Sequence, residues 1–378
     1  MTDEKTKTNS LKKLNHRGRA SQVRIYFGKL IRMFVFQNDW KVLPLSALIA
    51  GMVAMVIRND CFMTREGMLK GALALSCVAL WNGCFNSIQV ICRERDILKR
   101  EHRSGMHVSS YVISHVLYQG LLCLAQAVLT LYVCRVFGVK FPKEGILMSL
   151  FSMELTVTVF LITFAADMLS LFLSSLVHST TAAMTIMPFV LVFQLVFSGG
   201  IFSVPEQLSG VSELTISKYG MRCIAAEGGY NELPMMSGWN TLSGMRNSRL
   251  QGSFTVGQAL EFLNTADGEE AEEIRDYKIF GVLRTGDLMD VYRTDPEYEE
   301  LREEEIHVDV SIGEVIDTIG EETVKNAVLE KTGASAQKAD YERTESNILR
   351  CWLDLGLFSL AFFFLTMVSL KFIDLDKR

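Results

Sequence analysis

The sequence lacks the short motifs that mark common catalytic and nucleotide-binding sites. It contains no G-x-x-x-x-G-K-[ST] phosphate-binding loop, and no G-x-G-x-x-G, C-x-x-C, H-E-x-x-H or G-x-S-x-G motif. Its six histidines are scattered along the chain and indicate no metal site. We therefore expect no ATPase and no bound cofactor in this chain, and an enzyme activity has no motif to support it.

Charge is nearly absent from several long stretches. The 22 residues from Gly71 to Cys92 carry none, and the 61 residues from Gly145 to Pro205 carry only Glu154 and Asp167. A bilayer core of about 30 Å needs about 20 mostly apolar residues in a helix, and backbone in lipid must satisfy its own hydrogen bonds. The apolar blocks predict an all-α polytopic membrane protein with six transmembrane helices, near residues 40–57, 71–92, 109–134, 146–177, 181–202 and 349–371.

Basic residues gather in the short segments on one side of the predicted helices. Residues 1–41 hold ten Lys/Arg against three Asp/Glu, and residues 93–106 hold five against three. The positive-inside tendency places these segments in the cytoplasm, and six crossings then place both termini there. Residues 203–348, with 29 acidic and 13 basic residues, fall outside. We expect a multi-pass protein of the plasma membrane.

Cysteine usage gives no sign of a disulfide framework. Of eight cysteines, only Cys61 and Cys223 lie in the predicted outer segments, and the others lie in or beside predicted membrane helices. Residues 203–348 also lack an Asn-Xaa-Ser/Thr glycosylation acceptor. Both absences favour a bacterial plasma membrane over a eukaryotic cell surface.

These patterns divide the chain into five parts. Residues 1–20 are polar and basic and are expected to be disordered. In residues 21–39 apolar side chains recur at helical spacing among basic ones, which predicts an amphipathic helix at the membrane interface. Residues 40–202 hold the first five transmembrane helices, with a charged cytoplasmic hairpin at about 93–106. Residues 203–348 form a large, mostly helical extracellular insertion that begins with re-entrant helices, and residues 349–378 form the sixth helix and a cytoplasmic tail.

Three carboxylates lie within the predicted membrane helices. Ionisable groups there are costly and usually face a bundle interior or an aqueous cavity. Asp354 and Glu154 are close enough to the ends of their helices to reach water, whereas Asp167 lies deeper. Asp167 is the best candidate for a buried functional carboxylate, and a polar contact between helices is the alternative explanation.

Three segments together resemble a known family. They are the amphipathic helix ending in QNDW, the charged loop RERDILKREHRSGMHVSSYVISHVL, and the fifth predicted helix followed by SGGIFSVPEQLSGVSELTISKYGMRCIAAEGGY. They resemble the connecting helix, the coupling-helix region, and the fifth helix with outer re-entrant helices of the G subfamily of ABC transporters, within the ABC type 2 permease group. The chain departs from that pattern because it has no fused nucleotide-binding domain and because its insertion at 232–348 is much longer.

The resemblance implies the membrane-spanning permease subunit of an ATP-driven ABC exporter. Such a subunit would pair with a separate ATPase that carries ATP and Mg²⁺, and it would dimerise with an identical or different permease subunit in the lipid bilayer, with no nucleic-acid partner. The resemblance assigns contact with the ATPase to Glu94, Arg95, Arg100 and Glu101. It places a substrate path between the two permease copies, with candidate lining residues Trp81, Asn82, Asn86, Met187, Phe193 and Phe197.

Two other functions are compatible with the sequence. The chain can be a non-transporting membrane sensor or assembly factor whose acidic extracellular domain binds a ligand. It can also be a membrane enzyme that uses Asp167 or Glu154. A partner ATPase would distinguish the exporter from both. The sequence does not indicate the transported substrate.

Overall fold

The computed structural model describes residues 18–36, 39–200, 205–258, 261, 275–276, 278–279, 283–335 and 337–372. Most of the predicted disordered N-terminus, and the end of the predicted fifth helix at 201–202, lie outside these residues. The chain forms two compact units. One comprises Met1–Met235 with Gly333–Arg378, and the other comprises Met236–Thr332. We describe each unit separately.

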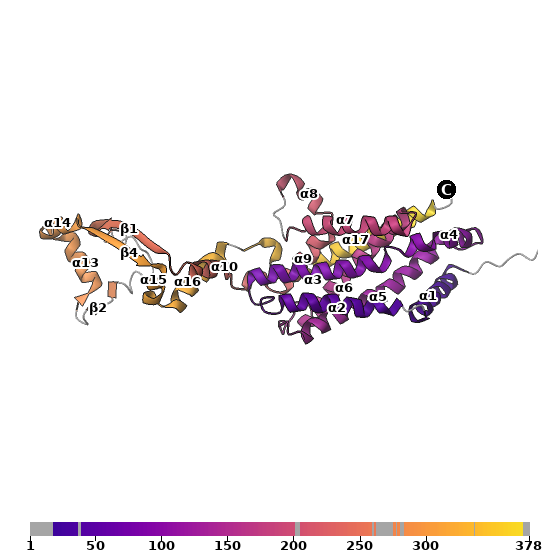
Figure 1. The fold of residues 1–378 in the computed structure, drawn as a ribbon, viewed down its shortest axis with the longest axis horizontal. Coiled ribbons are helices and arrows are strands. Elements are labelled where there is room, and N and C mark those ends of the chain that lie inside the picture. The colour runs from indigo at the N-terminus through magenta and orange to yellow at the C-terminus, as the bar shows by residue number, and fades with distance from the viewer. Residues whose placement is uncertain are drawn as a thin grey trace, which may run out of the picture. The chain divides into compact units, whose positions relative to one another are not determined.

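The first unit is a helical bundle (Figure 1). Its helices are α1 (Arg19–Phe36), α2 (Val42–Ile57), α3 (Arg65–Ser87), α4 (Val90–Arg103), α5 (Val108–Val136), α6 (Phe151–Leu176), α7 (Thr180–Val196), α8 (Ser209–Ser212), α9 (Ile216–Glu227) and α17 (Glu345–Lys371). Short 3₁₀ turns lie at Asp39–Lys41 (η1), Glu206–Leu208 (η2), Tyr230–Glu232 (η3) and Ala339–Tyr341 (η5).

Five helical segments among the described residues are long and apolar enough to cross a membrane: Asp39–Ile57, Arg65–Arg103, Val108–Val136, Phe151–Leu176 and Glu345–Lys371. The sequence predicted six. The remaining apolar helix, α7, has 17 residues and spans about 25 Å at about 1.5 Å per residue, which is at the short end of the range for a membrane helix. The protein is thus a mostly helical, polytopic membrane protein.

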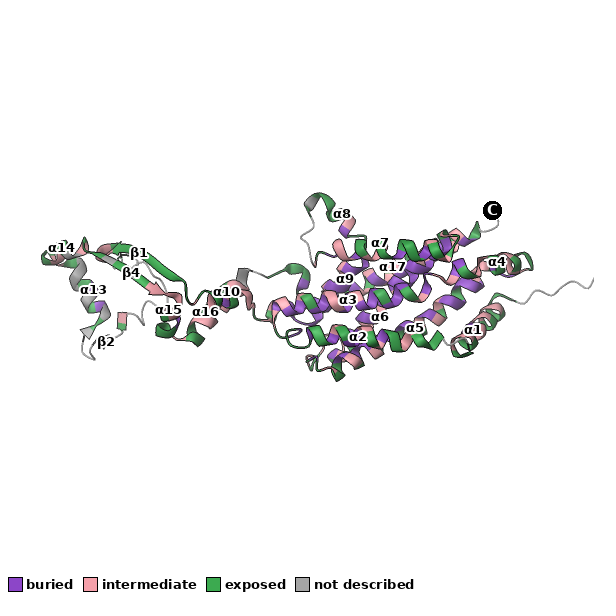
Figure 2. Cartoon of the chain, viewed as in Figure 1, coloured by how far each residue is buried: buried purple, intermediate pink, exposed green. Residues whose placement is uncertain are grey.

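The centre of the bundle is the pair α3 and α6. About 67% of the apolar window of α6 is buried, against 22% for α17, and Figure 2 shows buried residues concentrated on α3, α6 and α9. Gly83 permits this close approach, because a Cβ atom there would lie 2.1 Å from the carbonyl oxygen of Thr163 on α6. The outward faces of the peripheral helices expose large apolar side chains, as expected of surfaces that meet lipid: Leu45, Leu48 and Met52 on α2, and Leu353, Leu357 and Leu360 on α17.

The predicted start of the fourth helix near Ile146 is wrong. The helix begins at Phe151, and residues 139–150 are not helical. The backbone amides of Ile146, Leu147 and Met148 donate to the carboxylate of Glu154 instead of joining a helix.

Arg65, at the start of α3, holds both ends of the chain that leads to the second unit. Its side chain is 5% exposed and donates to the carbonyl oxygens of Leu233 at 2.7 Å, Asn231 at 2.6 Å and Gly333 at 2.5 Å. The guanidinium also lies 5.8 Å from the centre of the Tyr230 ring. The departing and returning segments are therefore fixed to the same helix.

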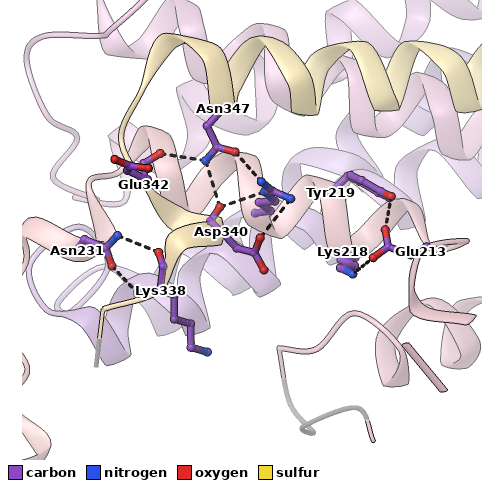
Figure 3. Close-up of polar contacts among 9 residues, drawn as sticks. Glu213, Lys218, Tyr219, Asn231, Lys338, Asp340, Glu342 and Asn347 are labelled. Atoms are coloured by element: carbon purple, nitrogen blue, oxygen red, sulfur yellow. Dashed lines mark hydrogen bonds and ion pairs between the residues drawn. The ribbon is translucent and has the colours of Figure 1, made fainter. Parts of the chain in front are cut away.

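Further polar contacts fasten the returning segment to η3 and α9 (Figure 3). The side-chain amide of Asn231 donates to the carbonyl oxygen of Lys338 at 3.0 Å and accepts from its backbone amide at 3.1 Å. Arg222 on α9 donates to the Asp340 carbonyl oxygen at 3.0 Å and to Asn347 Oδ1 at 2.8 Å. We call these contacts, together with those of Arg65, the neck.

In the described residues of the second unit, short helices are combined with two small sheets. Its helices are α10 (Ser237–Gly244), α13 (Thr285–Thr294), α14 (Glu299–Arg302), α15 (Ile312–Ile319) and most of α16 (Glu321–Ser335), with η4 at Pro296–Tyr298. Strand β1 (Arg249–Thr255) pairs antiparallel with β4 (Glu305–Ser311), and β2 (Lys278–Ile279) pairs with β3 (Leu283–Arg284). These helices agree with the mostly helical insertion that the sequence predicts, whereas the sequence analysis did not predict the strands.

Candidate coupling surface and buried polar sites

The charged helix α4 has one face in solvent and one face against its neighbours. Arg93, Asp96 and Arg100 are exposed. Leu98 and Ile91 are fully buried, and they pack with Tyr111 in a cluster that also contains Leu370 from the end of α17. The exposed charges are therefore carried by a helix that is anchored in the bundle.

Two of the predicted coupling residues face the protein rather than solvent. Glu101 Oε2 accepts from the Tyr26 hydroxyl of α1 at 2.6 Å. Glu94 Oε2 accepts from the Tyr111 hydroxyl of α5 at 3.1 Å, and Glu94 Oε1 lies 3.7 Å from Lys29 Nζ. Burial, and next the Glu101 carboxylate, raise the pKa of Tyr26, which keeps its hydroxyl protonated as a donor. Glu94 and Glu101 thus join α4 to α1 and α5.

The helices α4 and α6 cap each other. The first turn of α4 has no capping side chain of its own, and the amides of Ile91 and Cys92 donate to the Ser174 hydroxyl of α6 at 3.1 and 3.2 Å. In return, Arg95 Nη1 donates to the carbonyl oxygens of Ser175 and Val177, at the end of α6, at 2.9 and 3.1 Å. Groups left unpaired at both helix ends are satisfied by the partner helix, so α4 and the end of α6 are fixed to each other.

Of the four predicted coupling residues, only Arg100 is exposed. Glu94, Arg95 and Glu101 are partly buried in the contacts just described. The solvent-facing charged surface of α4, formed by Arg93, Asp96 and Arg100, is called the coupling face below.

The six predicted substrate-path residues fall into two groups. Trp81 on α3 and Phe193 on α7 are 45% and 36% exposed. Trp81 packs against the ring of Phe85 on the same helix, and Phe193 packs against Phe197, which directly follows α7. By contrast, Asn82 and Met187 are buried.

The sixth residue, Asn86, is held by an amide pair. Its side chain donates to Gln126 Oε1 at 2.8 Å and accepts from Gln126 Nε2 at 3.1 Å. The predicted path residues therefore divide into aromatic residues at the surface of the bundle and a packed group that consists of two asparagines and Met187.

Asp167 lies at the contact between α3 and α6. It is fully buried, and its Oδ1 accepts from the Ser87 hydroxyl at 2.6 Å. Its Oδ2 has no partner among the described residues. The structure therefore places this carboxylate in a polar contact between helices, directly beside the close approach at Gly83.

Glu154 is also fully buried and does not reach water. Its Oε2 accepts the amides of Ile146, Leu147 and Met148 at 2.7, 2.9 and 3.3 Å. The carboxylate supplies the hydrogen-bond acceptor that a helix or a strand would otherwise supply to these amides. This indicates a structural role for Glu154.

The sequence analysis missed a third buried carboxylate, Glu227 at the end of α9. It is fully buried and accepts from the Thr158 hydroxyl of α6 and from the Cys223 thiol, the latter at 3.5 Å. Trp352 of α17 donates its indole N–H to Thr158 Oγ1 at 2.7 Å. Glu227 was placed in an outer segment, and its burial follows from the packing of α9 between α3, α6 and α17.

Known proteins share the part of the chain that contains these sites. Residues 26–225, which are more than half of the chain, match the family model of the ABC-2 type transporter. An ABC transporter ATP-binding/permease protein of Mycobacterium tuberculosis (strain ATCC 25618 / H37Rv) is 30% identical over 151 residues, which are 39% of this chain and 17% of that protein. The chain thus matches about a sixth of the length of that relative. The chain belongs to the ABC-2 type transporter family, as a membrane-spanning permease.

Proposed function

We propose that this chain is the membrane subunit of an ATP-driven ABC exporter. It would work with a separate ATPase subunit that binds ATP and Mg²⁺, and with a second permease copy. The observation that carries the proposal is the mutual capping of α4 and α6 beneath an exposed, charged coupling face. The match to the ABC-2 family and the resemblance to the G subfamily support it, and export rather than uptake rests on that resemblance.

The coupling face is suited to docking on an ATPase. Arg93, Asp96 and Arg100 are exposed and mixed in sign, which gives a specific electrostatic contact. A displacement of α4 would reach α6 through Ser174 and Arg95, and α6 would pass it to α3. Because packed interfaces are bistable and do not deform continuously, such a push favours a switch between discrete helix arrangements.

Six crossings agree with the position of the helix ends better than five. α1 contacts α4 through Tyr26 and Glu101, and the end of α17 packs beside α4 through Leu370. These contacts place the start and the end of the transmembrane region near one face of the bundle, and this supports an even number of crossings. With α7 as the additional crossing, both termini lie in the cytoplasm with the basic helices α1 and α4.

A second permease copy would cover the exposed aromatic faces of α3 and α7. Trp81, Phe85 and Phe189 are 45%, 47% and 73% exposed. A substrate path between the two copies would then run along Trp81 and Phe193. Asn82, Asn86 and Met187 would join it only when the helices move apart.

Reconstitution with the cognate ATPase tests the proposal. We expect the ATPase to copurify with the chain, and its hydrolysis rate in liposomes to change when the chain is present. The double variant Asp96→Lys/Arg100→Glu reverses the coupling face without touching the buried contacts of Glu94 and Glu101, and it should reduce copurification at least tenfold. Arg58→Glu, an exposed charge in the segment between α2 and α3, serves as the matched control.

One result would contradict the proposal, and another would contradict only the assigned docking surface. If no ATPase copurifies and its activity is the same with and without the chain, the exporter interpretation is wrong and a sensor or assembly role gains support. If the ATPase binds but the coupling-face double variant behaves like Arg58→Glu, the family role stands and the docking surface lies elsewhere.

A further inference from the structure

A cavity of about 540 Å³ lies between α1, the junction of α3 and α4, and α5. Ligand pockets in proteins commonly have volumes of about 300–1,000 Å³. Half of its lining residues are apolar, among them Leu30 and Met33 of α1 and Phe85 and Ile88 of the α3–α4 junction. Of the predicted substrate-path residues, only Asn86 lines it.

Two buried polar atoms of α5 have no hydrogen-bond partner at this cavity. Gln119 is 1% exposed and His115 is 3% exposed, and both line the cavity. Gln119 Oε1 and His115 Nδ1 lack a partner among the described residues. An unsatisfied buried polar group costs about 1–3 kcal/mol, so both atoms favour an occupant that can bond to them.

The geometry of Gln119 defines what the occupant must supply. Its Nε2 already donates to the Asn86 carbonyl oxygen at 3.4 Å, so Oε1 is the amide atom that is left without a partner among the described residues. An amide oxygen only accepts hydrogen bonds. A ligand that satisfies Oε1 must therefore carry a donor such as a hydroxyl or an amide N–H.

The charged groups at the cavity balance one another. The lining contains two basic residues, Lys29 and Arg93, and two acidic residues, Asp39 and Glu94, and Lys29 Nζ already lies 3.7 Å from Glu94 Oε1. A ligand with a net charge of either sign would meet as much repulsion as attraction. The apolar walls, by contrast, favour an aliphatic or ring portion.

We propose that this cavity binds an uncharged amphiphile that presents a hydroxyl or amide donor to Gln119 and packs its apolar portion against α1 and the α3–α4 junction. Such a ligand would contact both α1 and the helix pair that carries the coupling face. The binding site stands on the cavity itself, and only an effect on ATP hydrolysis would depend on the proposed function.

Photolabelling of the full chain in phosphatidylcholine nanodiscs tests the site. The probe is 1-monolaurin with a diazirine in its acyl chain, and mass spectrometry locates the labelled peptides. We expect labelling in residues 29–33 of α1, in residues 85–97 and in residues 115–122. Unlabelled 1-monolaurin should compete at least ten times better than methyl laurate, which has no donor, and better than laurate or dodecyltrimethylammonium, which are charged.

Substitutions show whether an amphiphile or a trapped water molecule bonds to Gln119. Gln119→Leu should reduce the preference for 1-monolaurin over methyl laurate at least fivefold. Thr130→Val is the matched control, because Thr130 is also buried on α5 with an unpartnered hydroxyl but does not line the cavity. Met33→Trp, which fills the cavity from α1, should reduce labelling of residues 115–122 even if Gln119→Leu does not fold.

Three outcomes would overturn the proposal. Labelling spread evenly over the lipid-facing helices would show no site. Equal competition by methyl laurate would show that the site does not recognise the hydroxyl donor of the ligand and that water satisfies Gln119. Stronger competition by laurate or by the cationic amphiphile would show that the charge balance has been misjudged. None of these results depends on finding an ATPase.

Discussion

Among single residues, Glu154 has the clearest structural task. Its carboxylate accepts three consecutive backbone amides from the chain before α6, and this segment has no helix or strand to pair them otherwise. A membrane helix that starts at Phe151 rather than near Ile146 therefore depends on one side chain. Loss of that acceptor leaves three partly buried donors unpaired, and a fully buried one would cost about 1–3 kcal/mol.

We expect Glu154→Ala to lower the melting temperature of the purified protein clearly, and Glu154→Gln to lower it less because the amide oxygen still accepts. Thermal unfolding followed by size-exclusion chromatography in detergent measures both. Glu144→Gln, an exposed acid of the same segment, should leave the melting temperature unchanged. Equal melting temperatures for Glu154→Ala and the wild type would refute this role.

Asp167 lends itself to an isosteric test. Asparagine keeps the oxygen that accepts from the Ser87 hydroxyl. It also removes the negative charge of a fully buried carboxylate whose Oδ2 has no partner among the described residues. We expect Asp167→Asn to fold and to support ATPase stimulation as the wild type does, whereas Asp167→Leu should be destabilised. A well-folded Asp167→Asn protein that no longer stimulates the ATPase would instead assign the carboxylate a role in transport.

Between elements, the contact of α3 with α6 leaves no room for a side chain at Gly83. A Cβ there would lie 2.1 Å from the Thr163 carbonyl oxygen and 2.8 Å from the Asp167 amide nitrogen. We expect Gly83→Ala to push the helices apart and to cost about 1–3 kcal/mol, as overpacking usually does. Gly120→Ala on α5 is the matched control, since its Cβ would lie 3.7 Å from Phe164; similar thermal stability of the two variants would contradict the packing argument.

Helices were predictable from the sequence where a local run of apolar or charged residues determines them. Uninterrupted apolar runs predicted the long membrane helices, and the charged run after Cys92 predicted a separate short element between α3 and α5, now α4. The candidate carboxylate Asp167 was also singled out, because a lone charge deep in an apolar run is unusual on any fold.

What the sequence did not reveal depends on contacts between distant segments. Glu94 and Glu101 look like docking charges until Tyr26 and Tyr111 are seen to donate to them. Strand β4 pairs with β1 about fifty residues earlier. The alternation of apolar and polar residues in EIHVDVS was its only local signal.

At the scale of the whole molecule, Arg65 decides how firmly the neck is held. We expect Arg65→Ala to release the segments around Asn231 and Gly333, because three partly buried carbonyl oxygens lose their donor. Limited proteolysis should then cut residues 231–236 or 333–338 at least five times faster than in the wild type. Arg58→Ala, an exposed arginine in the preceding segment, should be cut at the wild-type rate; an unchanged rate for Arg65→Ala would show that the neck does not rely on it.

The amide pair between Asn231 and Lys338 brings the two ends of the insertion side by side. A piece of chain whose ends are neighbours can be removed, lengthened or exchanged by joining two points that already touch, and no helix of the bundle has to be rerouted. Evolution can therefore add or discard such a module as a unit while the transport machinery stays intact. An experimenter can use the same junction to replace the module with a fluorescent protein or an affinity tag.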